Sequence, residues 1–206
     1  ISLDVSGATA LIQLGCEFNQ LISLDVSANT DLTWLFCDFN QLTSLDLTNN
    51  TLLYYLYCQG NQIASLDLSQ NTALTELSCY NNQLTSLDLI SNIALEYLDC
   101  EGNQLTSLDI SQNTVLEDLN CAANLLTSLD VSNGNNINMT LYANGNPLSC
   151  IEVDDVAWST SNWTVANAAI SSWMSFSVNC SAALGCTDPA YAEYNSFATI
   201  DDGSCL

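Results

Sequence analysis

The sequence contains no lysine, arginine or histidine, against 23 aspartates and glutamates, so its formal net charge is −23. Because no cationic side chain can neutralise a phosphate, the composition argues against nucleic-acid binding and against anionic membrane surfaces. The same absence removes an imidazole base, a Schiff-base lysine and a Ser-His-Asp triad. A hydrophobic content of 48% is that of a folded protein, so the acidity does not signal disorder.

Long apolar runs and an N-terminal leader are also missing. No stretch approaches the roughly 20 apolar residues that cross a membrane, and Ile1 already stands inside a repeat. We therefore predict no membrane insertion, and we interpret the chain as a processed or partial piece of a longer secreted protein.

What the sequence has in abundance is repetition. Seven segments align, and we number them as coils 1 to 7: residues 1–21, 22–42, 43–63, 64–84, 85–105, 106–126 and a degenerate 127–148. The unit reads T-S-L-D-L-S-x-N-T-x-L-x-x-L-x-C-x-x-N-x-L. A single unit repeated at constant length predicts a solenoid, in which each coil buries its apolar face against the next.

Each unit contains two short stretches that alternate with period two. One is Leu-Asp-Leu, as at residues 66–68, and the other is Leu-x-Cys, as at residues 77–79. The alternation predicts two short parallel strands per coil and little helix, hence a mainly β fold. An Asn follows each stretch and can turn inward to bond the free backbone groups of the bend.

This spacing matches the general leucine-rich pattern. Over residues 1–148 it resembles the short leucine-rich repeats of large secreted and cell-surface proteins of Bacteroidetes-type bacteria, which implies a secreted or cell-surface location. Residues 149–181 look like the cap that follows such repeats. That segment supplies aromatic bulk for covering a solenoid end, in Trp158, Trp163, Trp173 and Phe176.

The cysteines fall into two classes. Six occupy one repeat column, and their parallel Cβ vectors suit stacking better than disulfide formation: Cys16, Cys37, Cys58, Cys79, Cys100 and Cys121. We predict buried free thiols that act as small apolar side chains. A metal–thiolate stack is the alternative, which we disfavour because structural zinc needs four converging ligands.

Four further cysteines follow the repeats, and three pairings are possible. We favour Cys150 with Cys180, which would clip the cap, and Cys186 with Cys205. Disulfides imply an oxidising compartment and so agree with secretion.

Residues 182–206 form a predicted small acidic module held by the second disulfide. It reads G-C-T-D-P-A-Y-A-E-Y-N-S-F-A-T-I-D-D-G-S-C and resembles a short module of secreted proteins from marine and environmental bacteria, departing from it at Glu193 and Ser196. A loop this small has almost no hydrophobic core, so it needs a further stabilising element besides the disulfide. Hard oxygen ligands for Ca2+ are available at Asp188, Asn195, Asp201 and Asp202. The alternative is a loop whose acidic side chains are simply solvated.

Two outward surfaces differ in how much they vary. The Ser and Asp columns beside one strand hardly change, and we interpret their row of carboxylates as structural, with repeated cation sites as the alternative. The columns around the Leu-x-Cys strand vary and are rich in rings, which predicts a ligand-binding face: Trp34, Phe36, Tyr55, Tyr57, Tyr80 and Tyr97. Packing of these rings against a missing N-terminal part of the protein is the alternative.

These features favour an extracellular, non-catalytic binding or adhesion module that recognises a glycan or a protein. Carboxylate pairs can run glycoside hydrolysis, but here they arise from repetition and none is singled out in a pocket. A structural segment of a long surface or filament protein, joined by self-assembly, is a second hypothesis. Ice binding by a flat polar ladder is a third, disfavoured by the charge on every coil.

Overall fold

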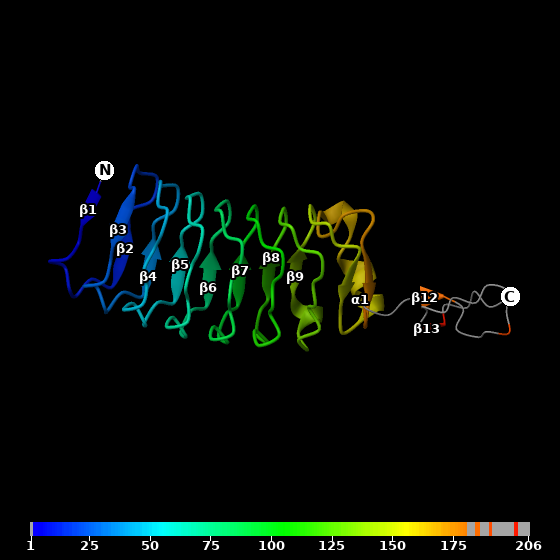
Figure 1. The fold of residues 1–206 in the computed structure, drawn as a ribbon. Helices are drawn as coiled ribbons and strands as arrows, with labels where there is room; N and C mark the ends of the chain where they lie inside the picture. Colours follow the sequence, from blue (N-terminus) through cyan, green and yellow to red (C-terminus); the bar gives the residue numbers. More distant parts are fainter. Residues whose placement is uncertain (1, 181–183, 186–189, 191–199, 202–206) are drawn as a thin grey trace.

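The computed structural model describes residues 2–180, 184–185, 190 and 200–201. The coils stack along one axis, with β1 and α1 at opposite ends of the stack (Figure 1). One side of the stack is a seven-stranded parallel sheet in the order β2-β4-β5-β6-β7-β8-β9. Its strands are Gln13–Gly15, Trp34–Phe36, Tyr55–Tyr57, Glu76–Ser78, Tyr97–Asp99, Asp118–Asn120 and Thr140–Tyr142.

The register of this sheet repeats the register of the sequence. Equivalent residues of neighbouring coils lie side by side, so Leu35 pairs with Leu56 and Leu56 with Leu77. These central leucines are fully buried. Burying such a side chain contributes about 1.5–3 kcal/mol, so the leucine columns hold the coils together.

Inward-pointing Asn side chains satisfy the backbone at the bends, as the sequence predicted. Asn61 Nδ2 donates to the carbonyl oxygens of Cys37 at 3.1 Å and Cys58 at 3.0 Å, while its Oδ1 accepts from Leu42 N at 3.0 Å. The bonds to Cys37 and Leu42 join coil 3 to coil 2. The same pattern recurs at Asn40, Asn82, Asn103 and Asn124.

A second Asn column links the coils on the opposite side. Asn50 Nδ2 donates to the carbonyl oxygens of Val26 at 3.1 Å and Asn29 at 2.9 Å. The Oδ1 atoms of this column are buried without a hydrogen-bond partner among the described residues: Asn29, Asn50, Asn71, Asn92 and Asn113.

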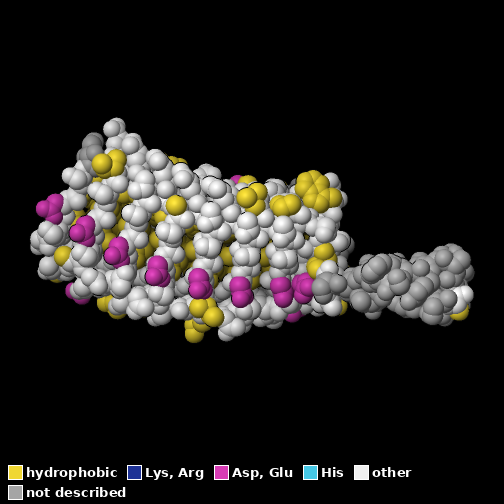
Figure 2. All heavy atoms as spheres, in the orientation of Figure 1, with side chains coloured by type: hydrophobic (Ala, Val, Ile, Leu, Met, Phe, Trp, Pro, Cys, Tyr) yellow, Lys and Arg dark blue, Asp and Glu magenta, His cyan; other side chains and the backbone are white. Residues whose placement is uncertain are grey.

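The prediction of a second strand in every coil was wrong beyond coil 2. Strands β1 (Ser2–Asp4) and β3 (Ser23–Asp25) pair, but within the described residues the same segment forms no strand in coils 3 to 6. Grooves separate the coils on this side, for example between Asp25 and Asp46 (Figure 2). In coils 3 to 6 no backbone hydrogen bond joins these segments within the described residues, and Asn side chains such as Asn50 and Asn71 connect neighbouring coils instead.

The cap continues the stack for about one more turn. β10 (Cys150–Glu152) lies beside coil 7 through the Asp130–Glu152 bridge, and β11 (Ser175–Ser177) pairs with β10. Between them run α1 (Val156–Asn162) and the short 3-10 helix η2 (Val165–Asn167), while η1 (Asn136–Asn138) lies within coil 7. In the described part of the chain, no helix has the length and apolarity to cross a membrane.

The aromatic residues of the cap differ in their burial. Trp163 is buried, and its Nε1 donates to Met139 O at 3.1 Å, so it seals coil 7. Trp158 and Phe176 are partly buried and contact Trp163. Trp173 is 62% exposed, so the expectation that it fills the cap was wrong.

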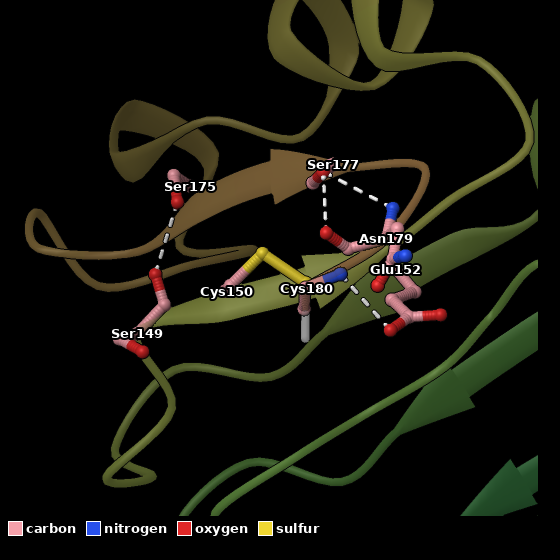
Figure 3. The surroundings of a disulfide bond; sticks show 7 residues. All are labelled: Ser149, Cys150, Glu152, Ser175, Ser177, Asn179 and Cys180. Atoms are coloured by element: carbon pink, nitrogen blue, oxygen red, sulfur yellow. Dashed lines mark hydrogen bonds between the residues drawn. A yellow bond between two sulfur atoms is a disulfide. The ribbon is translucent and has the colours of Figure 1, made fainter. Parts of the chain in front are cut away.

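A disulfide joins Cys150 to Cys180, as predicted. Its surroundings are tied to β10 and β11, because Cys180 N donates to Glu152 Oε1 at 2.9 Å and Ser175 Oγ donates to Ser149 O at 3.1 Å (Figure 3). Cys186, Cys205, Asp188, Asn195 and Asp202 lie outside the described residues. Of the predicted module, the structure describes the parallel pair β12 (Leu184–Gly185) and β13 (Ile200–Asp201).

The six ladder cysteines are free thiols and all are buried. Burial raises the pKa of Cys58 and of Cys121 to about 12. The thiols are therefore neutral, and they pack as apolar side chains in the sheet side of the core.

Candidate binding face

The outward residues of the seven-stranded sheet, with the one or two residues that follow each ladder cysteine, form a surface that we call the sheet face. In every strand the central leucine points into the core, so its two neighbours point out. Trp34 and Phe36 flank Leu35 in β4 in this way. Because the strands are in register, each outward position forms a column across the coils.

Four of the six predicted ring residues contact one another and form what we call the aromatic cluster. Trp34 meets Tyr55 edge-on at 5.2 Å between ring centroids, and Phe36 lies 4.9 Å from Tyr57. Trp34 and Phe36 are 6.2 Å apart and complete the cluster. Trp34 is 37% exposed, while the other three rings are half-buried.

The remaining two predicted residues lie elsewhere on the sheet face. Tyr80 contacts Phe39 at 6.2 Å between centroids, and the described residues offer Tyr97 no ring contact. Two rings that the sequence did not single out enlarge the surface. Phe18 and Phe39 stack at 4.7 Å with planes 14° apart, and Phe18 is 73% exposed.

Phe18 and Phe39 stand at a backbone position that suits glycine. Their φ angles are 54° and 50°, in the left-handed region, and Gly60 and Gly102 fill the same position in coils 3 and 5. A left-handed conformation costs a bulky residue energy and is found preferentially at functional positions. Gly and Asn residues recur in this column, and they were the sequence signal that could have indicated a left-handed backbone at Phe18 and Phe39.

Acidic side chains share the sheet face with the rings. The carboxylates are those of Glu17, Asp38, Glu76, Asp99, Glu101 and Asp118. Tyr57 Oη donates to Glu76 Oε2 at 2.5 Å, and burial together with this bond raises the pKa of Tyr57 above its ordinary range. Burial also raises the pKa of Asp38 and of Asp99, which lie almost entirely out of solvent.

The opposite side carries the regular Asp column, visible as a row of acidic side chains along the stack (Figure 2). Asp46 Oδ1 accepts from Thr48 N at 3.0 Å and from Thr48 Oγ1 at 2.6 Å, and these bonds lower the pKa of Asp46. Asp25 and Asp67 take the same bonds from Ser27 and Ser69. Local hydrogen bonds thus stabilise each charged carboxylate of the row.

Comparisons with known proteins agree with this geometry. Residues 72–113 match the family model described as Leucine Rich repeats (2 copies). The repeat units in this range are therefore leucine-rich repeats, and the stacked parallel coils have the fold of a leucine-rich-repeat solenoid. A search of curated proteins finds no significant match.

Several solved structures share the solenoid. An internalin, InlF, from Listeria monocytogenes is 22% identical with a TM-score of 0.59, covering 84% of this chain and 63% of that one. The Leptospira interrogans protein LIC12759 is 25% identical with a TM-score of 0.58, covering 70% and 46%. The functional domain of InlJ from Listeria monocytogenes, described as including a cysteine ladder, is 31% identical with a TM-score of 0.49, covering 79% and 50%. The chain spans about half the length of the first structures that it matches.

Proposed function

We propose that this chain is an extracellular, non-catalytic binding module that recognises its partner through the sheet face. The observation that carries the proposal is the aromatic cluster, in which Trp34, Phe36, Tyr55 and Tyr57 contact one another on an outward surface. Contiguous outward aromatics mark contact sites. The leucine-rich-repeat fold supports a binding scaffold, because a solenoid presents an extended surface with one variable column per strand position.

A protein partner or a glycan is compatible with this composition. Rings offer large contact area at low entropic cost, and Trp and Tyr are enriched where proteins bind each other. Rings beside carboxylates and amides also suit sugar rings. Extracellular placement rests on the Cys150–Cys180 disulfide, since such bonds persist in oxidising compartments.

Self-assembly is a second candidate function, and the sheet topology favours it. β2 is an edge strand of the seven-stranded sheet. Ile12, which directly precedes this strand, is 57% exposed. An edge strand with apolar neighbours is a template for pairing with another chain. Measurement of the molecular mass in solution, with and without calcium, tests this role; a monodisperse monomer in both conditions would reject it.

A screen against glycans and extracellular proteins, followed by substitution, tests the main proposal. The double variant Trp34→Ala/Tyr57→Ala removes two members of the aromatic cluster and should reduce binding of the identified partner at least tenfold, an estimate of about 1.4 kcal/mol or more. Trp173→Ala is the matched control, because it removes an exposed ring from the cap. Equal binding by both variants would reject the sheet face as the binding surface.

Calcium binding by Asp188, Asn195, Asp201 and Asp202 remains a proposal that rests on residue chemistry. Isothermal titration with calcium tests it, and the absence of both heat and structural change would reject it.

A further inference from the structure

Two hydrogen-bond acceptors are buried on the sheet face where solvent would be expected. Asp38 is 6% exposed and Gln59 is 8% exposed, although each directly follows a ladder cysteine of the sheet side. They are neighbours across coils 2 and 3, because Phe39 N donates to Gln59 O at 2.8 Å and so keeps the two segments in register. Alternation after an inward cysteine places both side chains on the outward side, where polar groups normally stay hydrated, so their burial requires a cover.

The cover is aromatic. The rings of Phe39 in coil 2 and Tyr80 in coil 4 meet across coil 3, 6.2 Å apart between centroids. Between them Gly60 lies against Phe39, whose Cδ1 is 2.6 Å from the place of a β-carbon on Gly60. Gln59 directly precedes Gly60 and therefore lies in the coil that the two rings span. The contact between the rings accounts for the low solvent exposure of Gln59.

Within the described residues, neither acceptor receives a hydrogen bond from another residue. Gln59 Oε1 is buried there without a hydrogen-bond partner, and the Asp38 carboxylate accepts only from its own backbone N–H. Burial raises the pKa of Asp38, its own backbone N–H lowers it in part, and Glu17 raises it further. The chain contains no lysine, arginine or histidine that could neutralise this carboxylate. A buried acceptor left unpaired destabilises the fold.

We propose that Asp38 and Gln59, beneath the rings of Phe39 and Tyr80, form a receptor for a cationic side chain of a basic protein partner. An ammonium or guanidinium group supplies the missing donors, and its charge is attracted both to the carboxylate and to the faces of the rings. The inference rests on the proposed function of the sheet face and names the chemistry of its partner. The net charge of −23 attracts such a partner from a distance.

The donor set favours a side-chain cation over a metal ion. In the described residues no group of three or more acidic or cysteine side chains is placed to hold a metal. One carboxylate, one amide oxygen and two rings suit an organic cation, which needs fewer charged ligands and gains from the π faces.

Titration with pentalysine and pentaarginine peptides tests the receptor at about 0.15 M salt, where distant charges are largely screened. We expect saturable one-to-one binding that Asp38→Asn weakens about tenfold or more, because a truncated partner leaves a buried charge unpaired. Asp67→Asn is the matched control: it changes the net charge equally but lies in the Asp row on the other side. Equal weakening by both variants would show diffuse attraction and overturn the proposal.

Gln59→Leu keeps the net charge and removes the unpaired oxygen. We expect this variant to be at least as stable as the parent chain while binding the peptides several-fold more weakly, roughly a loss of one hydrogen bond to a charged group. Unchanged peptide binding by Gln59→Leu would also overturn the receptor. If Trp34→Ala/Tyr57→Ala abolishes binding of a screened partner while Asp38→Asn does not, the receptor fails and the proposed function stands.

Discussion

The ring of Phe39 lies directly over Gly60 of the next coil. Its Cδ1 is 2.6 Å from the position that a β-carbon on Gly60 would occupy, and Gly60 itself has a φ of 65°. The absence of a side chain at Gly60 is therefore required both by the backbone and by the ring. This contact sets the position from which Phe39 reaches Tyr80 and Phe18.

Replacement of Gly60 by alanine should destabilise the solenoid by about 3 kcal/mol, through left-handed strain of about 1–2 kcal/mol and displacement of the ring. Gly134→Ala is the matched control, because Gly134 has a φ of 84° but no atom within 4 Å of the new β-carbon. Urea unfolding measures both. Equal losses of unfolding free energy in the two variants would contradict the ring contact.

Phe18→Asn separates stability from binding. Asn tolerates the left-handed backbone of Phe18, but it loses the stacked contact with Phe39. The two effects oppose each other, so the free energy of unfolding should change by less than about 1 kcal/mol. Partner binding should weaken several-fold. Ile22→Asn, at an exposed side chain with ordinary backbone, serves as the control; if it weakens binding as much as Phe18→Asn, the stacked pair has no special role.

The two Asn columns should differ in how much each side chain stabilises the fold. Asn61 Nδ2 donates to three backbone carbonyl oxygens and its Oδ1 accepts from a fourth backbone group, while the Oδ1 of Asn71 has no partner among the described residues. Asn61→Ala should therefore cost about 1 kcal/mol more than Asn71→Ala. Chemical denaturation of the two variants measures the difference. A larger loss for Asn71→Ala would show that its oxygen is satisfied in solution, by water for example.

The thiol ladder predicts a loss of stability at alkaline pH. Burial raises the pKa of Cys58 from 9.0 to about 12, so the folded state keeps the proton that the unfolded state loses above pH 9. The stability that this thiol contributes is fully present below its pKa in the unfolded state, and it is lost as the pH rises through its pKa in the folded state. Cys58→Ala should therefore reduce the dependence of the unfolding free energy on pH between about pH 9 and pH 12. An unchanged slope would mean that the thiol ionises in the folded protein.

Much of the fold could be predicted because the repeat imposes it. Identical spacing forces equivalent residues such as Leu35 and Leu56 into register, and the Asn and Cys columns then have one available role. The absence of the second strand from coils 3 to 6 could not be predicted. A strand requires backbone pairing between neighbouring coils, and alternation within a single repeat does not report that pairing.

The proposed binding face was harder to predict than the fold. The outward columns followed from alternation in the strands, and Trp34 and Tyr57 flank buried leucines in this way. Phe18 and Phe39 lie beyond the strands, and their left-handed backbone is not reported by alternation. The contact between Phe39 and Tyr80 joins non-adjacent coils, which a linear motif cannot show.

Hydroxyl-radical footprinting of the chain with its screened partner tests the sheet face most directly, because the method reports solvent access to Trp, Tyr and Phe side chains. We predict that the partner reduces oxidation of Trp34, Phe18 and Phe39, which are 37%, 73% and 37% exposed, and leaves the 62% exposed Trp173 unchanged. Protection of Trp173 with continued oxidation of the sheet-face rings would contradict binding at this surface.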